Sequence, residues 1–282
     1  YFRRGDLEGE PRGEEVLRRY LEAAILSVRA YRRLLGQERC DVALFHHGLY
    51  VPQGPVGEVC REAGVRVVNW VVAYRSNSFI LSEGDTYHHT LMTEPVSEWR
   101  GMDWGERQRA EIGAYLKSRW RGERDWIGFH EKPEEDAAAL AASLGLDLSK
   151  PVIGMLSNVV WDAQLHYPAN AFPNLIDWAA RTIDYFRGRP DLQLLLRIHP
   201  AEVRGTSPSR QPLLAEIEKR FPDLPSNVFI IPPESPVSTY AAMDLCDSVL
   251  IYGTKTGVEL TAVGVPVVVA GEAWIKDKGL TL

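Results

Sequence analysis

The sequence predicts an α/β protein built around parallel β-sheets. Short, continuous apolar runs rich in Val, Ile and Leu recur along the chain, as expected for strands that are buried on both faces. Between these runs lie longer segments whose apolar residues repeat every three or four positions, which is typical of helices packed on one side. The chain has 282 residues, more than a usual single domain, so we expect two domains.

The first half of the chain alternates between helical and strand-like patterns. Val16, Leu21 and Ile25 lie on one apolar stripe, which predicts a helix over about 13–35. The β-branched run at 65–74 favours a strand over a helix. The other elements predicted in this half are a strand at 41–47 and helices at 55–63 and 105–121.

A change in amino-acid composition marks the predicted domain boundary. Within 131–151 an alanine-rich helical segment is followed by "GLDLSKP", which is typical of a connector, so we place the boundary near residue 149. The predicted domains are 1–149 and 150–282. Beyond the boundary the alternation of strands and helices is regular and predicts a parallel sheet covered by helices on both faces. Its predicted strands are 151–157, 192–200, 227–231, 248–252 and 265–271, and its predicted helices are 171–186, 210–221, 237–245 and 256–263.

Composition and cysteine usage exclude several classes of protein. A formal net charge of -6 argues against a general nucleic-acid binder, so we expect no nucleic-acid partner. Cys40, Cys60 and Cys246 are widely separated and match no metal-ligand spacing, which favours a reducing compartment. The charged opening segment is no secretory signal, and no apolar run approaches the length of a membrane span, so a cytoplasmic location is expected. The chain starts at Tyr1 rather than at a Met, which suggests a piece of a longer protein.

The segment "LIYGTKTGVEL" at 250–260 places hydroxyls, a cation and glycines between a predicted strand and a predicted helix. The free N–H groups and the dipole of a helix N-terminus favour an anion. Thr254 and Thr256 can add hydroxyl donors, Lys255 a positive charge, and Gly257 a close approach to the backbone. The segment therefore predicts a phosphate site. The alternative is that Thr254 or Thr256 only caps the helix.

A second polar segment, "RIHP" at 197–200, ends a neighbouring predicted strand. The carboxyl ends of parallel strands meet at one edge of a sheet, so Arg197 and His199 are expected near the threonines. A histidine at such an edge can donate to a phosphate or a base, and the following proline fixes the turn. A purely structural histidine is the alternative.

Several motifs, occurring in order, resemble the bacterial capsule polysaccharide biosynthesis proteins, a group that includes Kdo transferases of the GT-B fold. They are "NVVWDAQL", "AFPNLIDWAARTIDYF", "LLLRIHPAEV", "PPESPVSTYAAM", "IYGTKTGVELTAVGVPVVVAGEAW" and "KGLT". The resemblance covers most of 151–282 and over 1–150 rests mainly on "HHGLYVPQGPVGEVCREAGVRVV". It implies two Rossmann-like domains facing each other across a cleft, the C-terminal one holding a nucleotide-sugar donor and the N-terminal one an acceptor.

The resemblance also implies roles for the polar residues of the second domain. His199 matches the family's His-Pro motif, in which the histidine contacts the nucleotide or phosphate of the donor. Thr254, Thr256 and Gly257 match its phosphate loop, although "GTKTG" replaces a serine-rich version. Glu259 is a candidate to bind a ribose or sugar hydroxyl, with a surface salt bridge as the alternative.

Two residues are candidate catalytic groups. Asp162 follows the first strand of the second domain, and related Kdo transferases carry an aspartate in a similar motif. Its carboxylate could stabilise an oxocarbenium-like centre or act as nucleophile, or it could simply cap a turn. His46 ends the first clear strand and could deprotonate an acceptor hydroxyl. The pairs His46–His47 and His88–His89 are also metal candidates, but neither has the i, i+4 spacing of a helical site.

Other residues near the candidate site carry weaker signals. Lys278 near the end of the chain could neutralise a donor phosphate, although terminal lysines are usually only solvated. Trp99, Trp104, Trp120 and Trp126 could stack on sugar rings, with helix packing or a membrane-facing surface as alternatives. No Asp-x-Asp metal motif occurs, so we expect a metal-independent enzyme without a cofactor.

The predicted function is glycosyl transfer from a nucleotide-sugar, with CMP-Kdo as the leading candidate, to a capsular or surface polysaccharide or glycolipid. The resemblance implies a partner machinery for capsule assembly at the inner face of the cell membrane, where the protein would be peripheral. A phosphotransferase of the CDP-glycerol type is the alternative enzyme. A non-catalytic partner that binds a nucleotide or glycan is the alternative from another class.

Overall fold

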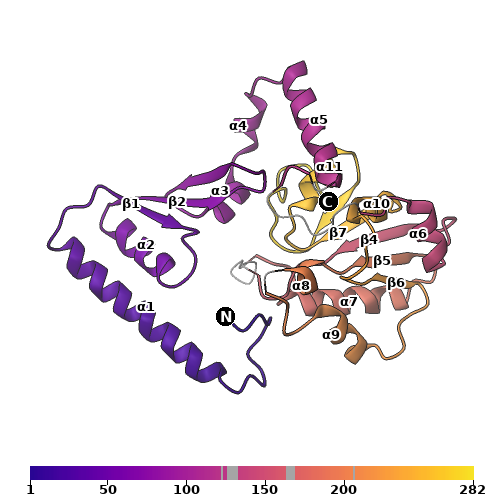
Figure 1. Cartoon of the computed structure of the whole chain (residues 1–282), viewed down its shortest axis with the longest axis horizontal. Helices are drawn as coiled ribbons and strands as arrows, with labels where there is room; N and C mark the ends of the chain where they lie inside the picture. Colours follow the sequence, from indigo (N-terminus) through magenta and orange to yellow (C-terminus); the bar gives the residue numbers. More distant parts are fainter. Residues whose placement is uncertain (122, 126–132, 163–168, 206) are drawn as a thin grey trace. The chain divides into compact units, whose positions relative to one another are not determined.

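The computed structural model describes residues 1–121, 123–125, 133–162, 169–205 and 207–282 (Figure 1). The chain forms two compact units, one of Tyr1–Asp6 with Trp99–Leu282 and one of Leu7–Glu98. The predicted boundary near residue 149 lies inside the larger unit, between α6 (Ala137–Leu144) and β4 (Val152–Leu156). A division into folding domains at that residue stays a prediction.

The larger unit is built on a five-stranded sheet in the order β6-β5-β4-β7-β8, with every neighbouring pair parallel. The α/β class with a parallel sheet is therefore confirmed. The first strand of this sheet along the chain, β4, is central. It is followed by β5 and β6 on one side and then by β7 and β8 on the other, so the strand order reverses between β4 and β7. The strands besides β4 are β5 (Gln193–Arg197), β6 (Val228–Ile231), β7 (Ser248–Ile251) and β8 (Val267–Val269).

Both faces of this sheet are covered by helices, which explains the unbroken apolar runs (Figure 1). In β5, Leu194 and Leu196 belong to one core cluster, whereas Leu195 belongs to the other. The first cluster includes residues of α7 (Leu175–Arg187) and α9 (Leu213–Arg220). The second includes residues of α6, α10 (Thr239–Asp244) and α11 (Thr256–Ala262). The larger unit also contains α5 (Glu106–Arg121) and α8 (Ala201–Arg204).

Helix boundaries in the larger unit follow the local capping chemistry. The side chain of Asn174 accepts the N–H of Asp177 and so caps α7. Asp136 caps α6 in the same way through the N–H of Ala139. The left-handed residue Gly145 then ends α6.

The smaller unit holds a three-stranded sheet in the order β1-β2-β3. β1 and β2 are parallel, as predicted, but β3 pairs antiparallel with β2 and was not predicted. This sheet is therefore mixed. Its elements are α1 (Gly13–Leu35), β1 (Val42–His46), α2 (Gln53–Glu62), β2 (Arg66–Val72), β3 (Phe79–Glu83) and α3 (Tyr87–Thr93). The division between the two units then falls within the sequence of α4 (Val96–Arg100).

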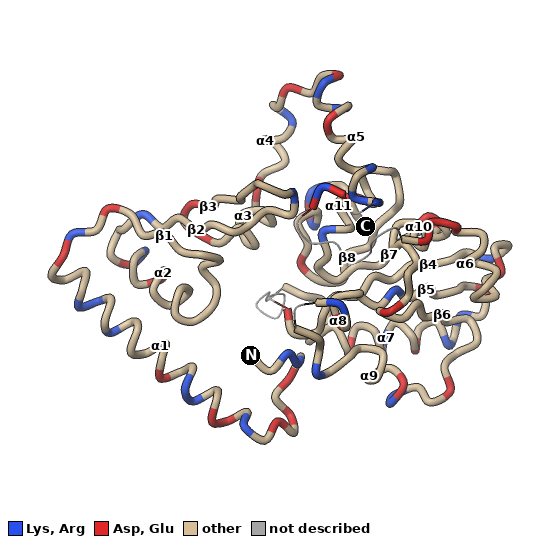
Figure 2. The backbone as a smooth tube through the Cα atoms, in the orientation of Figure 1, with Lys and Arg blue, Asp and Glu red and all other residues tan. Residues whose placement is uncertain are grey.

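The long helix α1 has the predicted bounds but not a buried stripe. Val16 is buried, whereas Leu21 and Ile25 of the predicted stripe are exposed. Charges of both signs are spread along the helix (Figure 2), with Glu14 in the first turn and Arg32 in the last, where they complement the helix dipole. Among the helices of the described ranges, none combines the length and hydropathy needed to cross a bilayer.

Candidate active site

Three strand ends of the larger sheet are tied together by hydrogen bonds at its carboxyl edge. Ser157 follows β4, and its hydroxyl oxygen accepts the backbone N–H of His199, which follows β5, at 2.9 Å. Asn158 accepts the backbone N–H of Gly253, which follows β7, at 3.4 Å. The sequence predicted this edge from His199 and the "GTKTG" segment. It missed Ser157 and Asn158, although a Ser-Asn pair directly after an apolar strand was a visible signal.

His199 is held in one tautomer by its own backbone. Its Nδ1 atom accepts the N–H of Ala201 at 3.1 Å, so the neutral ring carries its proton on Nε2. Burial, and then the positive charge of Arg197, lower the pKa of His199 to about 4. At neutral pH this side chain is therefore an uncharged N–H donor.

Arg197 lies at the buried end of β5, with only 1% of its surface exposed. Its guanidinium donates to the carbonyl oxygens of Pro232, Ser235 and Val237, in the loop that precedes α10. Burial, and then the charge of Arg204, lower the pKa of Arg197 to about 10, so it stays protonated at neutral pH. The structure therefore shows Arg197 holding a loop, and contact with a donor stays a prediction.

The two threonines form a local hydroxyl pair at the start of α11. The Thr254 hydroxyl accepts the N–H of Thr256 at 3.3 Å and donates to the Thr256 hydroxyl oxygen, also at 3.3 Å. The Thr254 hydroxyl thus satisfies the first free N–H of α11 from the position before the N-cap residue Lys255, whose own side chain makes no capping bond. These two bonds leave the Thr256 hydroxyl able to donate a hydrogen bond, and phosphate binding by this pair stays a prediction.

Gly257 is required for packing. A Cβ atom at this position would lie 2.4 Å from Cδ1 of Ile251 and 3.0 Å from Cδ1 of Ile275. Its missing side chain lets α11 approach the sheet closely, which is a known use of glycine next to a Rossmann-like strand. The sequence interpretation, an approach of phosphate oxygens to this backbone, is not what makes the glycine necessary here.

Lys255 and Glu259 belong to a buried ionic network. One Glu259 oxygen lies 3.0 Å from Lys255 Nζ and 2.8 Å from Arg119 Nε, and the other accepts the hydroxyl of Tyr240. Arg119 also pairs with Asp125. Although burial opposes ionisation, Arg119 and Lys255 hold the pKa of Glu259 below its usual value. Of the two roles predicted for Glu259, the structure shows the salt bridge, in the interior rather than at the surface.

Two of the predicted sugar-stacking tryptophans pack inside the larger unit. Lys278 is buried, and its Nζ atom lies 4.6 Å from the ring centre of Trp99. The ring of Trp120 stacks on Tyr240 at 5.4 Å. Trp104 is exposed, and Trp126 lies outside the described residues.

The two predicted catalytic residues lie in different units. Asp162 is exposed, and its backbone N–H donates to Val159 at 3.3 Å in the segment after β4. His46 ends β1 in the smaller unit, where its ring packs 4.6 Å from Trp70 and 4.3 Å from His47. The catalytic roles of both residues stay predictions. Within the part of the chain that the structure describes, no group of three or more His, Cys, Asp or Glu side chains is arranged to hold a metal ion.

Comparisons with known proteins bear on the fold. No protein-family model matches the sequence, and no curated protein matches it significantly. Among solved structures, the beta Kdo 2,4 transferase of Thermosulfurimonas dismutans KpsC is similar with a TM-score of 0.55 and 13% identity, over 85% of this chain and 71% of that one. The beta Kdo 2,7 transferase of the same KpsC gives a TM-score of 0.48 and 14% identity, over 84% of this chain and 82% of that one. A family 9 glycosyl transferase from Veillonella parvula gives a TM-score of 0.33 and 13% identity, over 94% of this chain and 64% of that one. The first of these similarities, together with the parallel sheet, shows that this chain has a GT-B-like α/β fold.

Proposed function

We propose that this protein is a glycosyltransferase that binds the nucleotide of its donor at the carboxyl edge of the five-stranded sheet. The proposal rests on two hydrogen bonds, through Ser157 and Asn158, that connect the segments following β4, β5 and β7. The strand order reverses between two of these strands, β4 and β7. In open parallel sheets, ligands bind at that place.

The groups at this edge suit a phosphate ester through neutral donors. His199 would offer the N–H of its Nε2 atom, and Thr254 and Thr256 would offer hydroxyls. Lys255 is already paired with Glu259, so its charge is partly neutralised before a donor arrives. Fixed N–H and O–H dipoles can stabilise a leaving phosphate without a metal ion, provided that they are pre-organised.

We further propose CMP-Kdo as the donor and a capsular or surface polysaccharide or glycolipid as the acceptor. The ordered motifs of the second half support this choice, as does the similarity of fold to a protein described as a beta Kdo 2,4 transferase. In this scheme Asp162 stabilises or attacks the anomeric carbon, and His46 is the sequence-predicted base. The reaction would take place in the cytoplasm, with peripheral attachment to the membrane where the capsule is assembled.

Nucleotide binding is tested by thermal shift with CMP, CDP, UDP and GDP. A ligand at 100 times its Kd should add about 2.7 kcal/mol to the free energy of unfolding. His199→Ala should weaken this response, whereas Tyr185→Phe, on the exposed side of α7, should leave it unchanged. An undiminished response in His199→Ala would contradict the placement of the donor.

Transfer itself is tested with Asp162→Asn. This variant should bind the nucleotide as the wild type does but should lose transfer of the labelled sugar. If the wild type transferred glycerol phosphate from CDP-glycerol instead, the phosphotransferase alternative would replace the proposal. Nucleotide binding without any turnover would favour the non-catalytic alternative.

A further inference from the structure

An arginine that no sequence motif singled out reaches the predicted phosphate segment. The Nε atom of Arg119, in α5, lies 2.8 Å from Oε1 of Glu259, in α11. The same oxygen atom lies 3.0 Å from Nζ of Lys255, the central residue of "GTKTG" (253–257). One carboxylate oxygen is therefore shared by two cationic side chains, one of which lies 140 residues before Glu259 in the chain.

These three side chains are buried deeply enough for their charges to act at a distance. The exposed fractions are 18% for Arg119, 14% for Lys255 and 5% for Glu259, so water and salt screen these charges weakly. Burial opposes the charge of Arg119, but Glu259 outweighs burial and raises the pKa of Arg119 above its ordinary value. Arg119 therefore carries a full positive charge at neutral pH.

The charges around Glu259 balance only when Arg119 is counted. Glu259 and Asp125 contribute two negative charges, and Arg119 contacts both of them. Lys255 and Arg119 contribute two positive charges. Tyr240 donates a hydrogen bond to the other Glu259 oxygen but brings no charge. Without Arg119, these described residues would carry a net negative charge beside the segment that is predicted to bind a phosphate.

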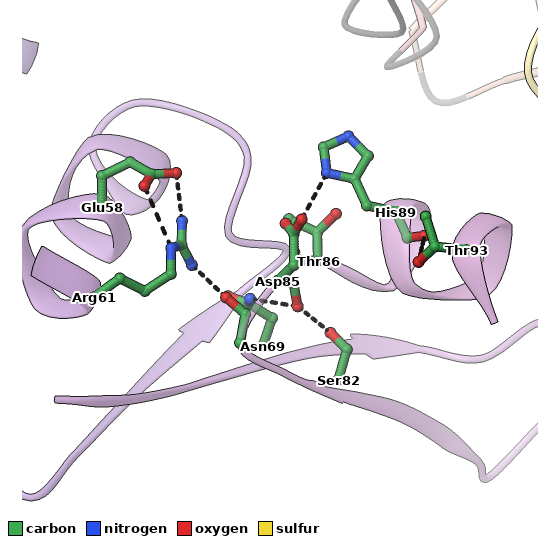
Figure 3. A network of polar contacts seen from close by, with 9 residues as sticks. Glu58, Arg61, Asn69, Ser82, Asp85, Thr86, His89 and Thr93 are labelled. Atoms are coloured by element: carbon green, nitrogen blue, oxygen red, sulfur yellow. Dashed lines mark hydrogen bonds and ion pairs between the residues drawn. The ribbon is translucent and has the colours of Figure 1, made fainter. Parts of the chain in front are cut away.

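A polar network in the smaller unit shows a different use of an arginine (Figure 3). Arg61 pairs with Glu58 and donates to the carbonyl oxygen of Gly84 at 2.7 Å. Because that acceptor belongs to the backbone, this network holds the turn before α3. The described contacts of Arg119 are with carboxylates instead, and one of these, that of Glu259, also holds the predicted phosphate segment.

We propose that Arg119 is a positioning residue for phosphate binding at "GTKTG". Arg119 holds Glu259 and compensates its charge, so that Glu259 fixes the ammonium of Lys255 without cancelling its attraction for a phosphate. Arg119 itself does not touch the donor in this scheme. The inference deepens the proposed function and rests on it, because it assigns the phosphate of the donor nucleotide to this segment.

The test separates the phosphate of a nucleotide from its base and ribose. The Kd values of CMP and cytidine are measured by isothermal titration calorimetry, and their ratio, cytidine over CMP, is the phosphate preference. Contacts to the base and the ribose are common to both ligands, so the ratio isolates the phosphate. Arg119→Met should lower the preference about tenfold, which Coulomb's law gives for one charge about 12 Å away at an effective dielectric constant of about 20. Arg119→Lys, which keeps the charge, should retain most of the preference.

A carboxylate variant should act in the opposite direction. Glu259→Gln keeps the shape of the side chain but removes its negative charge, so it should raise the phosphate preference about tenfold. The double variant Arg119→Met/Glu259→Gln should return the preference toward the wild type. If Arg119 only held α11 in place, both single variants would instead lower it. Arg181→Met, on α7 at the opposite face of the sheet, removes the same charge as Arg119→Met and should leave the preference unchanged.

Urea denaturation shows which variants fold. Asp125→Asn carries the test if Arg119→Met does not fold, because it removes the other carboxylate that Arg119 contacts and should raise the preference. The inference is wrong, and the donor site stands, if the folded variants keep a preference within about twofold of the wild type, as for charges screened by water. A lowered preference in Glu259→Gln would contradict the inference too. If the wild type binds CMP no more tightly than cytidine, the donor site and the inference fail together.

Discussion

The hydroxyl oxygen of Ser157 accepts the backbone N–H of His199 at 2.9 Å, which joins the residues that follow two neighbouring parallel strands. This bond fixes the backbone of His199, and the N–H of Ala201 then fixes its ring through Nδ1. One buried serine therefore helps to set the direction of the candidate donor-binding histidine. The relationship can be tested without knowing the substrate.

Ser157→Ala should lower the free energy of unfolding by about 1–3 kcal/mol, because it leaves a buried N–H group without its acceptor. Ser149→Ala, at an exposed position before β4, should change it by no more than about 0.5 kcal/mol. Urea denaturation of both variants checks the difference. Equal and small effects would mean that another group satisfies the N–H of His199.

Stability should depend on pH through His199. Burial lowers the pKa of His199 in the folded state to about 4, whereas its ordinary value is 6.5. Between these values the unfolded chain binds the proton more tightly, so the stability present above pH 6.5 is lost as the pH falls toward 4. Relative to His199→Gln, the wild type should lose at most about 3 kcal/mol over this range. Parallel stability curves for the two proteins would contradict the low pKa.

Glu202 should act in the opposite direction. It is buried, and both of its oxygens accept the N–H of Leu213, at 3.2 and 3.1 Å. Burial raises the pKa of Glu202 to about 7 from an ordinary 4.5, although the bond from Leu213 opposes the shift. The stability that Glu202 contributes is therefore fully present below pH 4.5 and is lost as the pH rises through 7.

Comparing Glu202→Gln with the wild type should reveal this pH-dependent loss of stability. The amide oxygen can still accept the N–H of Leu213, but the side chain does not ionise. The stability of the variant relative to the wild type should therefore rise by at most about 3 kcal/mol between pH 4.5 and 7. Glu218→Gln, on the exposed side of α9, should show no such trend in denaturation experiments at several pH values.

The larger sheet could be predicted because each of its strands contains a continuous apolar run. In β5 this run is Leu194–Leu196, and all five residues of the strand are buried. β3 was missed because its sequence, Phe79–Glu83, ends in Ser and Glu and has an exposed face, so it resembles the polar loops around it. The exposed stripe of α1 was misjudged for a related reason. Periodicity identifies an apolar face but does not show what covers it.

The sequence predicted where the candidate site lies in the fold, but it did not predict most of the contacts that its residues make. His199 and Thr254 lie at one edge because the carboxyl ends of parallel strands share it, as anticipated. The predicted neighbourhood of their two strands was wrong, because β4 lies between β5 and β7. The partners of Arg197 could not, because they are carbonyl oxygens 35 to 40 residues away in the chain. The partner of Glu259 across the unit, Arg119, is 140 residues away. Only the i, i+4 pair of Lys255 and Glu259 was visible in the sequence.

The buried network around Glu259 predicts a large stability effect. Glu259→Ala leaves Arg119 and Lys255 in the interior without their shared counter-charge, which should cost about 3–5 kcal/mol. Tyr240→Phe removes the hydroxyl that donates to Glu259 but leaves the charges in place, and it should cost about 1 kcal/mol. Denaturant unfolding measures both. In a double-mutant cycle, Arg119→Met should cost much less in the Glu259→Ala background, and additive losses would contradict a direct pair.

Substitution of Gly257 tests whether the glycine is required for packing or for ligand binding. Gly257→Ala places a methyl group 2.4 Å from Ile251 Cδ1 and should cost about 1–3 kcal/mol through overpacking. Gly113→Ala is the matched control, since it lies within α5 with nothing within 4 Å of a new Cβ. It should stabilise the protein by about 0.5–1 kcal/mol, because alanine is the better helix former.

The nucleotide thermal shift completes the comparison of the two glycine variants. If packing alone requires Gly257, the folded Gly257→Ala protein keeps a nucleotide-induced shift of wild-type size at a lower starting Tm. A lost shift without a lower Tm would instead mean that the ligand approaches this backbone closely, as the phosphate-loop interpretation of the sequence holds. The separation works because the added methyl group faces Ile251 and Ile275, in the core beneath α11.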